Sequence, residues 1–440
     1  MSKRTPITFL NNSRLRLLTM CALYVSQGLP QGFINVALKN HLYAQGHSLA
    51  AVGGMVSMIS LPWALKFLWG PVIDRFGFAA MGKRRPWLIL SQALTVLVLL
   101  GLALIPELDT SLQLLGWAIL GMNIFIALQD VGTDSLAVDI IPQKDRGKAN
   151  GFMYGCSYLG SFLGASLIGE LLLRDGGSMQ AALLALAACV FAIMLLPLLI
   201  RERPGEKLLP WTAGSSQLKG EEKHARSAGE LFRNIFTAFQ HRVAIAAAGL
   251  AVLAAITEAI LNNVAANYFI NEGGWDKKVY SQLESLGYWF SLGGCFIAGF
   301  FADKLGGKRA ILIAGSLLAC TWIIFSRLHA YWDAKWLIAT NMYVLAVLSG
   351  LFRVSMFTLF MNIANRRVAA SQFTAYMSLL NLSSFIGNRS AGWVRDTLPS
   401  VPAVYLAAGI FHLGVMAFVI LAIKPPRNPA ELPPSPTGGS

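Results

Sequence analysis

The sequence predicts an all-α integral membrane protein with twelve transmembrane helices in two pseudo-symmetric six-helix bundles. Of its 440 residues, 55% are hydrophobic and only 13% are charged. A soluble domain carries about 25% charged residues, so this composition excludes a soluble fold. The other two observations are the number of long apolar segments and a loop pattern that occurs twice.

Twelve apolar segments are long enough to cross a bilayer, which takes about 20 helical residues. The first one follows a basic start and continues without a small-residue cleavage site, so we interpret it as a retained span and not a signal peptide. The segments are 15–38, 47–71, 87–106, 112–141, 149–172, 179–200, 243–270, 279–302, 310–328, 334–363, 371–395 and 401–423.

A loop with the same sequence of features follows two of these segments. Residues 70–85 (GPVIDRFGFAAMGKRR) and 299–309 (GFFADKLGGKR) both combine an Asp-basic pair, glycine and a basic cluster. Their separation of about half the chain predicts a duplicated architecture. The pattern is either a topology signal alone or a gate that bridges helix ends; we assign gating to Asp74, Arg75, Arg84, Arg85, Asp303, Lys304 and Arg309.

Basic residues predict the orientation and the domain limits. With a cytoplasmic N-terminus, 26 of the 36 Lys and Arg residues fall on the cytoplasmic side and 7, including Lys39 in a loop, on the other. This asymmetry predicts that both termini are cytoplasmic. It also explains the net charge of +14 without a nucleic-acid partner. We expect bundles at 1–200 and 243–423, a flexible cytoplasmic linker with a surface amphipathic helix at 201–242, and a disordered tail at 424–440.

Charged residues inside spans are functional candidates, because a charge in hydrocarbon is costly. Asp130 and Asp134 share one face of the fourth predicted helix. Lys66 in the second span lies at a similar depth, counted at 1.5 Å per residue from the cytoplasmic end. We interpret the three residues as a proton-coupling site; the alternative is a static ion pair that holds two helices together.

The second half carries a further polar set. Glu258, Asn262 and Asn267 lie in the seventh span, Arg353 in the tenth and Arg389 in the eleventh. They predict a wet, substrate-binding wall. The arginines either neutralise Glu258 or bind an anionic substrate, and the sequence leaves both possibilities open.

Several classes of protein are disfavoured. The sequence has no nucleotide-binding loop, catalytic triad or zinc pattern, so we expect no enzyme activity, no cofactor and no metal. The five cysteines all lie in apolar segments and are interpreted as packing residues. Glycines at four-residue spacing, such as Gly160 and Gly164, predict close helix packing.

Five stretches carry a family resemblance: 24–32 (YVSQGLPQG), 61–75 (LPWALKFLWGPVIDR), 82–87 (GKRRPW), 127–134 (ALQDVGTD) and 373–380 (FTAYMSLL). They resemble the AmpG-type muropeptide permeases and the related acetyl-coenzyme A transporters. The doubled loop is similar to the loop signature of the major facilitator superfamily. Ala165 stands after Gly164 where drug-proton antiporters of the superfamily carry proline, which counts against efflux.

The resemblance implies proton-driven import of a bulky, often anionic solute across a bacterial cytoplasmic (inner) membrane. The expected partners are a small-molecule solute, protons and the lipid bilayer, and the expected state is a monomer. Gln129 and Tyr158 join the predicted substrate contacts, although Tyr158 stands where the family commonly has arginine. The alternatives are a siderophore uptake permease, or a receptor or scaffold with the same fold and no transport.

Overall fold

The computed structural model describes residues 8–69, 72–73, 76, 78–106, 108, 111–141, 146–215, 239, 241–363 and 369–423. The helices of these described residues form twelve continuous segments, and the remaining short helical turns lie in the connections between the segments. The expected all-α architecture with twelve spans is confirmed. The predicted surface helix falls mostly on 216–238, and the predicted tail is 424–440; both lie outside the described residues.

The first half supplies six spans, and two of them contain a π-helical stretch, η1 and η6. Lys39 lies in α2, so its expected position in a loop is wrong: the first span continues six residues beyond its predicted end, to Ala44. The elements are α1 (Ser13–Gly32), η1 (Phe33–Leu38), α2 (Lys39–Ala44), α3 (Leu49–Ala64), η2 (Lys66–Leu68), η3 (Ala79–Met81), α5 (Arg85–Ala103), α6 (Leu112–Ile140), α7 (Arg146–Leu163), η6 (Gly164–Ile168), α8 (Gly169–Leu173) and α9 (Met179–Leu199).

The second half repeats the count of six, and its first span is interrupted at Ala255. The elements are α11 (Arg242–Ala254), α12 (Ile256–Asn271), α13 (Lys277–Leu305), α14 (Gly307–Arg327), η8 (His329–Tyr331), α15 (Lys335–Ile363), α16 (Ala369–Thr397) and α17 (Val401–Ala422).

Side-chain caps explain several of the helix starts. The side chains of Asn12, Ser48, Ser178 and Ser400 each accept a hydrogen bond from the backbone amide three residues later. Such a cap satisfies one of the amides that a helix start leaves unpaired. The sequence therefore fixes where α1, α3, α9 and α17 begin.

Nine helices among the described residues are long and apolar enough to cross a membrane by length and composition. The first, eighth and eleventh spans do not pass this test because they carry more polar side chains. α16, for example, contains Asn381, Asn388 and Arg389 within one apolar stretch. A polar span is tolerated where its polar side chains find partners inside the protein.

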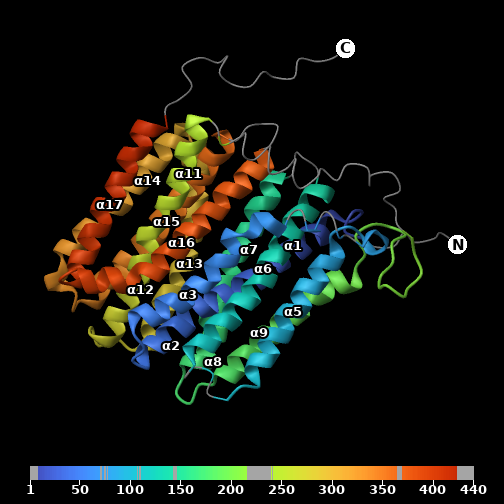
Figure 1. The fold of residues 1–440 in the computed structure, drawn as a ribbon, viewed down its shortest axis with the longest axis horizontal. Coiled ribbons are helices and arrows are strands. Elements are labelled where there is room, and N and C mark those ends of the chain that lie inside the picture. Colours follow the sequence, from blue (N-terminus) through green and yellow to red (C-terminus); the bar gives the residue numbers. More distant parts are fainter. Residues whose placement is uncertain are drawn as a thin grey trace, which may run out of the picture. The chain divides into compact units, whose positions relative to one another are not determined.

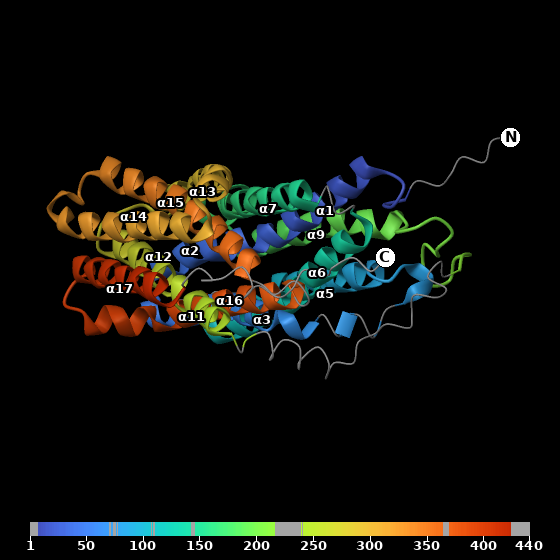
Figure 2. The same ribbon diagram turned by 90° about the horizontal axis from the view of Figure 1, so that it is seen from above.

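The chain forms two compact units, which we call the first and the second unit. The first comprises the described residues of Met1–Ala225, with Asn262–Trp289 and Asn388–Trp393; the second comprises those of Arg226–Leu261, Phe290–Gly387 and Val394–Ser440. The first unit therefore includes segments from the second half of the sequence. In the second unit α14 and α17 lie side by side in both views (Figures 1 and 2).

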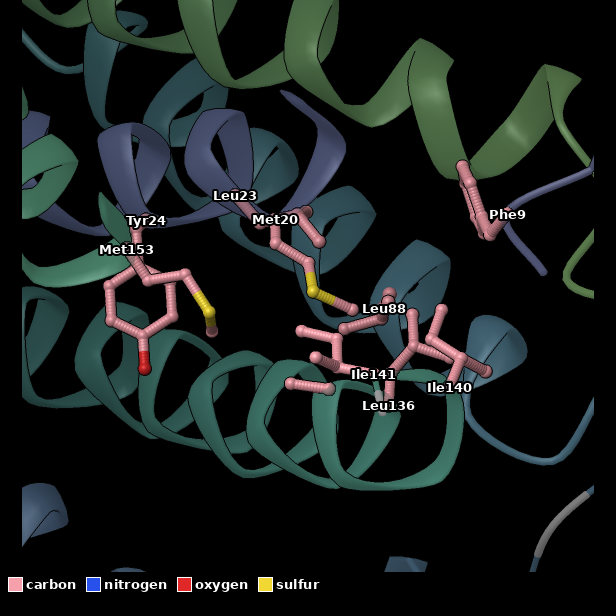
Figure 3. Packing of buried hydrophobic residues seen from close by; sticks show 10 residues of the cluster. Phe9, Met20, Leu23, Tyr24, Leu88, Leu136, Ile140, Ile141 and Met153 are labelled. Carbon is pink, nitrogen blue, oxygen red and sulfur yellow. The ribbon is translucent and has the colours of Figure 1, made fainter. Parts of the chain in front are cut away.

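A buried apolar cluster holds four helices of the first unit together. Figure 3 shows Met20 and Leu23 of α1 packed with Leu88 of α5, Leu136 of α6 and Met153 of α7. All five side chains are almost completely buried. These contacts fix α6 against α1 and α5, and α6 carries the acidic residues of the candidate site.

Glycines set the closest helix crossing in the first unit. A Cβ atom on Gly160 of α7, or on Gly164 at the start of η6, would overlap the backbone of Val25 or Leu29 in α1. Figures 1 and 2 both show α1 beside α7. The predicted packing role of these glycines is confirmed, because only a residue without a side chain lets the two backbones come so close.

The second unit has a matching crossing between the first and fifth spans of its half. A Cβ atom on Gly387 of α16 would meet the Ile256 carbonyl oxygen and the Ala259 side chain of α12. The same pair of spans therefore crosses at a glycine in both halves of the sequence, as a duplicated architecture predicts.

Candidate functional site

A buried ion pair joins the second and fourth spans. α3 ends after Ala64, and Lys66 begins the 3₁₀ turn η2. Its Nζ atom lies 3.0 Å from Oδ2 of Asp130 on α6, and the two side chains are only 10% and 5% exposed. The expected contact between the lysine and a carboxylate is therefore present.

The second carboxylate of the predicted coupling site has a different partner. The hydroxyl of Tyr24 on α1 donates a 2.5 Å hydrogen bond to Oδ1 of Asp134. Asp134 lies one helical turn after Asp130, so the two carboxylates share a face of α6. The site thus combines a carboxylate paired with Lys66 and a carboxylate held by a tyrosine.

Tyr24 was not predicted as a site residue. It is 4% exposed and makes an edge-to-face contact with Tyr154 of α7, at 5.8 Å between ring centroids. No spacing pattern in the sequence points to it, because Tyr24 and Asp134 are 110 positions apart. A tyrosine within an apolar span is by itself compatible with ordinary packing.

The two substrate contacts predicted for the first half have different environments. Gln129 is 2% exposed, and its amide nitrogen donates to the Leu23 carbonyl at 3.0 Å and to Ser26 Oγ at 3.1 Å. These bonds tie α6 to α1 and favour a structural role. Tyr158 of α7 instead contacts the ring of Tyr288 of α13, at 6.5 Å between centroids.

A second buried ion pair joins α2 to α13. Lys39 Nζ lies 2.9 Å from Glu284 Oε1, with the side chains 4% and 13% exposed. Asn40 donates to the other Glu284 oxygen at 2.5 Å and to Ser281 Oγ at 2.9 Å. We call Lys39, Asn40, Ser281 and Glu284 the Lys39–Glu284 cluster. The sequence analysis missed it, although a Lys and a Glu inside apolar stretches were the available signal.

Further hydrogen bonds extend from this cluster within the first unit. Lys39 Nζ also donates to the Asn262 carbonyl at 3.4 Å. Tyr43 donates to Asn263 Oδ1 at 3.0 Å, and Asn263 donates to Asn388 Oδ1 at 2.8 Å. Side chains of α2 are therefore connected to the parts of α12, α13 and α16 that belong to this unit.

The polar set predicted for the second half is divided between the units. Glu258 and Arg353 lie in the second unit, with Arg353 Nη2 3.6 Å from Glu258 Oε2. Asn262, Asn267 and Arg389 belong to the first unit. The structure thus brings together the glutamate and one arginine, and it gives Asn262 a backbone contact with Lys39.

Two of the predicted gating residues make well-defined contacts at the start of α5. Arg84 Nε lies 2.9 Å from Oδ2 of Asp139 at the end of α6. Arg85 is completely buried and donates to backbone oxygens. Its acceptors are the carbonyls of Met81, Pro197, Leu198, Lys207 and Leu208.

Arg85 thereby anchors the first part of the predicted linker, since Lys207 and Leu208 lie within it. Glu202 and Glu206 are also buried there. Burial raises the pKa of Glu202, and burial together with the Glu202 charge raises the pKa of Glu206 to about 7. Residues 201–215 are therefore folded against the first bundle.

For most of the other predicted gating residues, the side-chain positions are not described. Asp74 and Arg75 lie outside the described residues. Asp303 and Lys304 lie on α13, but their side chains are also outside the described part. Arg309 lies in the first turn of α14 and is exposed. The gating role of the doubled loop therefore stays a prediction. Among the described residues, no group of three His, Cys, Asp or Glu could hold a metal ion.

Twelve helical spans with ion pairs buried between them define this protein as a multi-pass membrane protein. The family model of the Major Facilitator Superfamily matches residues 20–388 and, in a second match, 247–439. The chain belongs to the major facilitator superfamily.

Named relatives agree with this assignment. The chain is 24% identical over 385 residues to the anhydromuropeptide permease of Escherichia coli (strain K12), covering 84% of this chain and 72% of the relative. It is 30% identical over 155 residues to the putative transporter AmpG 1 of Rickettsia conorii, covering 33% and 35%. The resemblance to AmpG-type permeases seen in the sequence is confirmed.

Solved structures share the fold. The crystal structure of a D-xylose-proton symporter matches with a TM-score of 0.69 and 13% identity, covering 94% of this chain and 98% of the symporter. The nucleoside transporter NupG matches with a TM-score of 0.69 and 12% identity, covering 93% and 99%. At this identity the match establishes the architecture alone.

Proposed function

We propose that this protein is a proton-coupled importer of a bulky, anionic, muropeptide-like solute. The observation that carries the proposal is the buried Lys66–Asp130 pair beside the Tyr24–Asp134 hydrogen bond. A buried charge pair contributes little net stability, because desolvation offsets its Coulomb attraction. A role in moving charge explains its presence better than a role in holding helices.

The pair supports a simple coupling cycle. A buried carboxylate that loses its cationic partner is more stable when it is protonated. If substrate or a helix movement separates Lys66 from Asp130, the carboxylate takes up a proton, and restoring the pair releases it. Tyr24 holds Asp134 in place through this cycle. One movable ion pair thus links proton transfer to conformation.

The solute class rests on similarity. The Escherichia coli relative is an anhydromuropeptide permease, and it matches along most of this chain. Tyr158 replaces the arginine common in the family, so anion binding must use other cations, of which Arg353 is one candidate. A siderophore remains the alternative solute, and a non-transporting receptor the alternative class.

The remaining elements of the proposal follow from the orientation. The charge asymmetry supports cytoplasmic termini in a bacterial inner membrane, and we propose a monomer that is not an enzyme and binds no nucleic acid. The Lys39–Glu284 cluster joins segments from both halves of the sequence. In a transport cycle this contact acts as a gate that closes and opens.

Purified protein in proteoliposomes tests the coupling. With a radiolabelled anhydromuropeptide and an imposed pH gradient, Asp130→Asn and Asp134→Asn should abolish accumulation. Exchange across the membrane needs no net proton movement and should survive in at least one variant. The matched control is Asp175→Asn, which alters an exposed carboxylate and should accumulate normally.

Two outcomes would contradict the proposal in different ways. If both variants still accumulate the solute against its gradient, the carboxylates are structural and Glu258 becomes the next coupling candidate. If the unaltered protein neither accumulates nor exchanges the anhydromuropeptide, the assigned solute class is wrong.

A further inference from the structure

A small polar cavity lies inside the second unit, beside the interruption of the seventh span. Its volume is about 50 Å³, and its polar lining consists of Glu258, Ser349, Arg353, Asn381 and Ser384. α12, α15 and α16 each contribute to this lining. Ligand pockets for whole drug-sized molecules measure about 300–1,000 Å³, so this cavity holds a head group and not an entire solute.

The interruption itself forms part of the cavity wall. Ala254 and Ala255 line it, and the Ala255 amide donates to the Ser383 hydroxyl at 3.0 Å. Ser383 is completely buried on α16, so this bond fixes the break between α11 and α12. Broken helices in transporters place binding groups near the middle of the membrane, and Glu258 follows the break by one turn.

The Glu258–Arg353 pair differs from the two buried lysine–carboxylate pairs of the first unit, Lys66–Asp130 and Lys39–Glu284. Its N–O distance is 3.6 Å, and its side chains are 28% and 44% exposed. The Lys66 and Lys39 pairs measure 3.0 and 2.9 Å, and none of their side chains exceeds 13%. A wide, solvent-accessible pair lets a ligand insert its own charges without first breaking a buried contact.

We propose that this cavity binds the amino-carboxylate end of the transported solute, which deepens the function proposed above. The Arg353 guanidinium offers paired donors that match a carboxylate. The Glu258 carboxylate accepts from the ligand's ammonium group. Ser349, Asn381 and Ser384 border the same space and provide hydrogen-bonding groups.

The two opposite charges of the cavity favour a zwitterion over an ion of either sign. A simple anion meets repulsion from Glu258, and a simple cation meets repulsion from Arg353. A ligand that carries both charges on neighbouring atoms satisfies both residues at once. Each charge-assisted hydrogen bond contributes about 1.5–3 kcal/mol, so a ligand with one charge should bind roughly tenfold to a hundredfold more weakly.

Ligand-detected NMR on the protein in lipid nanodiscs tests this inference without any ion gradient. Glycine is the zwitterionic probe. Acetate carries only the negative charge of glycine, and methylammonium carries only the positive charge. The unaltered protein should bind glycine at least tenfold more tightly than either. Arg327→Gln, which removes an exposed arginine in the same unit, is the matched control and should change nothing.

Substitutions at the pair should separate the two charges. Arg353→Gln should lose glycine and acetate binding but retain methylammonium, and Glu258→Gln should show the opposite selectivity. The exchanged double variant Glu258→Arg/Arg353→Glu should recover glycine binding, which excludes misfolding as the cause of the losses. An unaltered melting temperature in each variant provides a second check.

The inference is overturned if folded protein shows no preference for glycine, or if both Gln variants bind glycine like the unaltered protein. This result is distinguishable from failure of the proposed function. Glycine binding without transport of the anhydromuropeptide would leave the cavity assignment intact and refute the assigned solute class. Proton-driven transport without glycine preference would do the reverse.

Discussion

Removing the Glu284 carboxylate should open the contact between α2 and α13. Glu284→Gln keeps the shape of the side chain but leaves the Lys39 ammonium group buried without its counter-charge. Breaking a buried pair in this way costs about 3–5 kcal/mol. The cost applies only while Lys39 is buried, so it weakens the closed arrangement relative to an open one in which water reaches the lysine.

The size of the shift follows from this energy. Since about 1.4 kcal/mol corresponds to a tenfold change in an equilibrium constant, Glu284→Gln should raise the open-to-closed ratio roughly a hundredfold to a few thousandfold. Glutamine also offers one acceptor oxygen where Glu284 offers two, so Lys39 or Asn40 loses its hydrogen bond as well, which acts in the same direction. A closed form that is dominant before the change would become the minor form.

A cysteine reporter at Ser281 measures the opening, because Ser281 is 1% exposed in the closed contact. The Ser281→Cys change is made in protein whose five native cysteines are replaced. Its alkylation by a membrane-impermeant maleimide should be slow, and Glu284→Gln should accelerate it at least tenfold. The control Lys39→Met/Glu284→Met leaves no unpaired charge and should react at a rate close to that of the reporter alone.

Equal alkylation rates with and without Glu284→Gln, in protein that elutes as a single folded species, would refute this reasoning. The ion pair would then contribute nothing to closing the contact. Equal acceleration by the single and the double change would also count against it, because the effect would come from lost packing and not from an uncompensated charge.

Two further predictions concern stability. Gly164→Ala should lower the free energy of unfolding in detergent titrations by about 1–3 kcal/mol or more, because its methyl group meets the Leu29 backbone, whereas Gly121→Ala, with open space around it, should not. Because burial and the Glu202 charge raise the pKa of Glu206 from 4.5 to about 7, stability should fall as the pH rises from about 4.5 to 7, by at most about 3 kcal/mol. Glu206→Gln should lessen that fall in a pH series of melting temperatures, and the buried Glu202, whose pKa is also raised, accounts for the part that remains.

The depth of a residue along its span was predictable from the sequence. Comparing depths identified one contact that the structure contains, between Lys66 and Asp130. Lys66 and the acidic residues of α6 could be placed because each helical residue advances 1.5 Å from a membrane face. The twelve spans followed from apolar length in the same way. Both arguments use distance along one helix axis, which a sequence specifies directly.

Rotation about the helix axes and the choice of neighbours were not predictable in this way. Tyr24 faces Asp134, and Gln129, one residue before Asp130, faces Ser26 instead. Nothing in the local sequence distinguishes these directions, since they depend on the glycine-mediated approach of α1 to α7 and on the packing of α6 against both. Lys39 was misplaced for a related reason: its span continues past its last apolar run because Glu284 neutralises the lysine.

Three of the ion pairs can be ordered by the free energy that separating each pair would cost. The Lys66–Asp130 and Lys39–Glu284 pairs are short and buried, so separating either leaves charges that need water or a proton. The Glu258–Arg353 pair has a longer N–O distance and more exposed side chains, so separating it costs little. A coupled transporter needs both kinds of ion pair. Pairs that are costly to separate make the conformation depend on protonation and on closure of the contact. A pair that costs little to separate lets substrate bind without a further free-energy penalty.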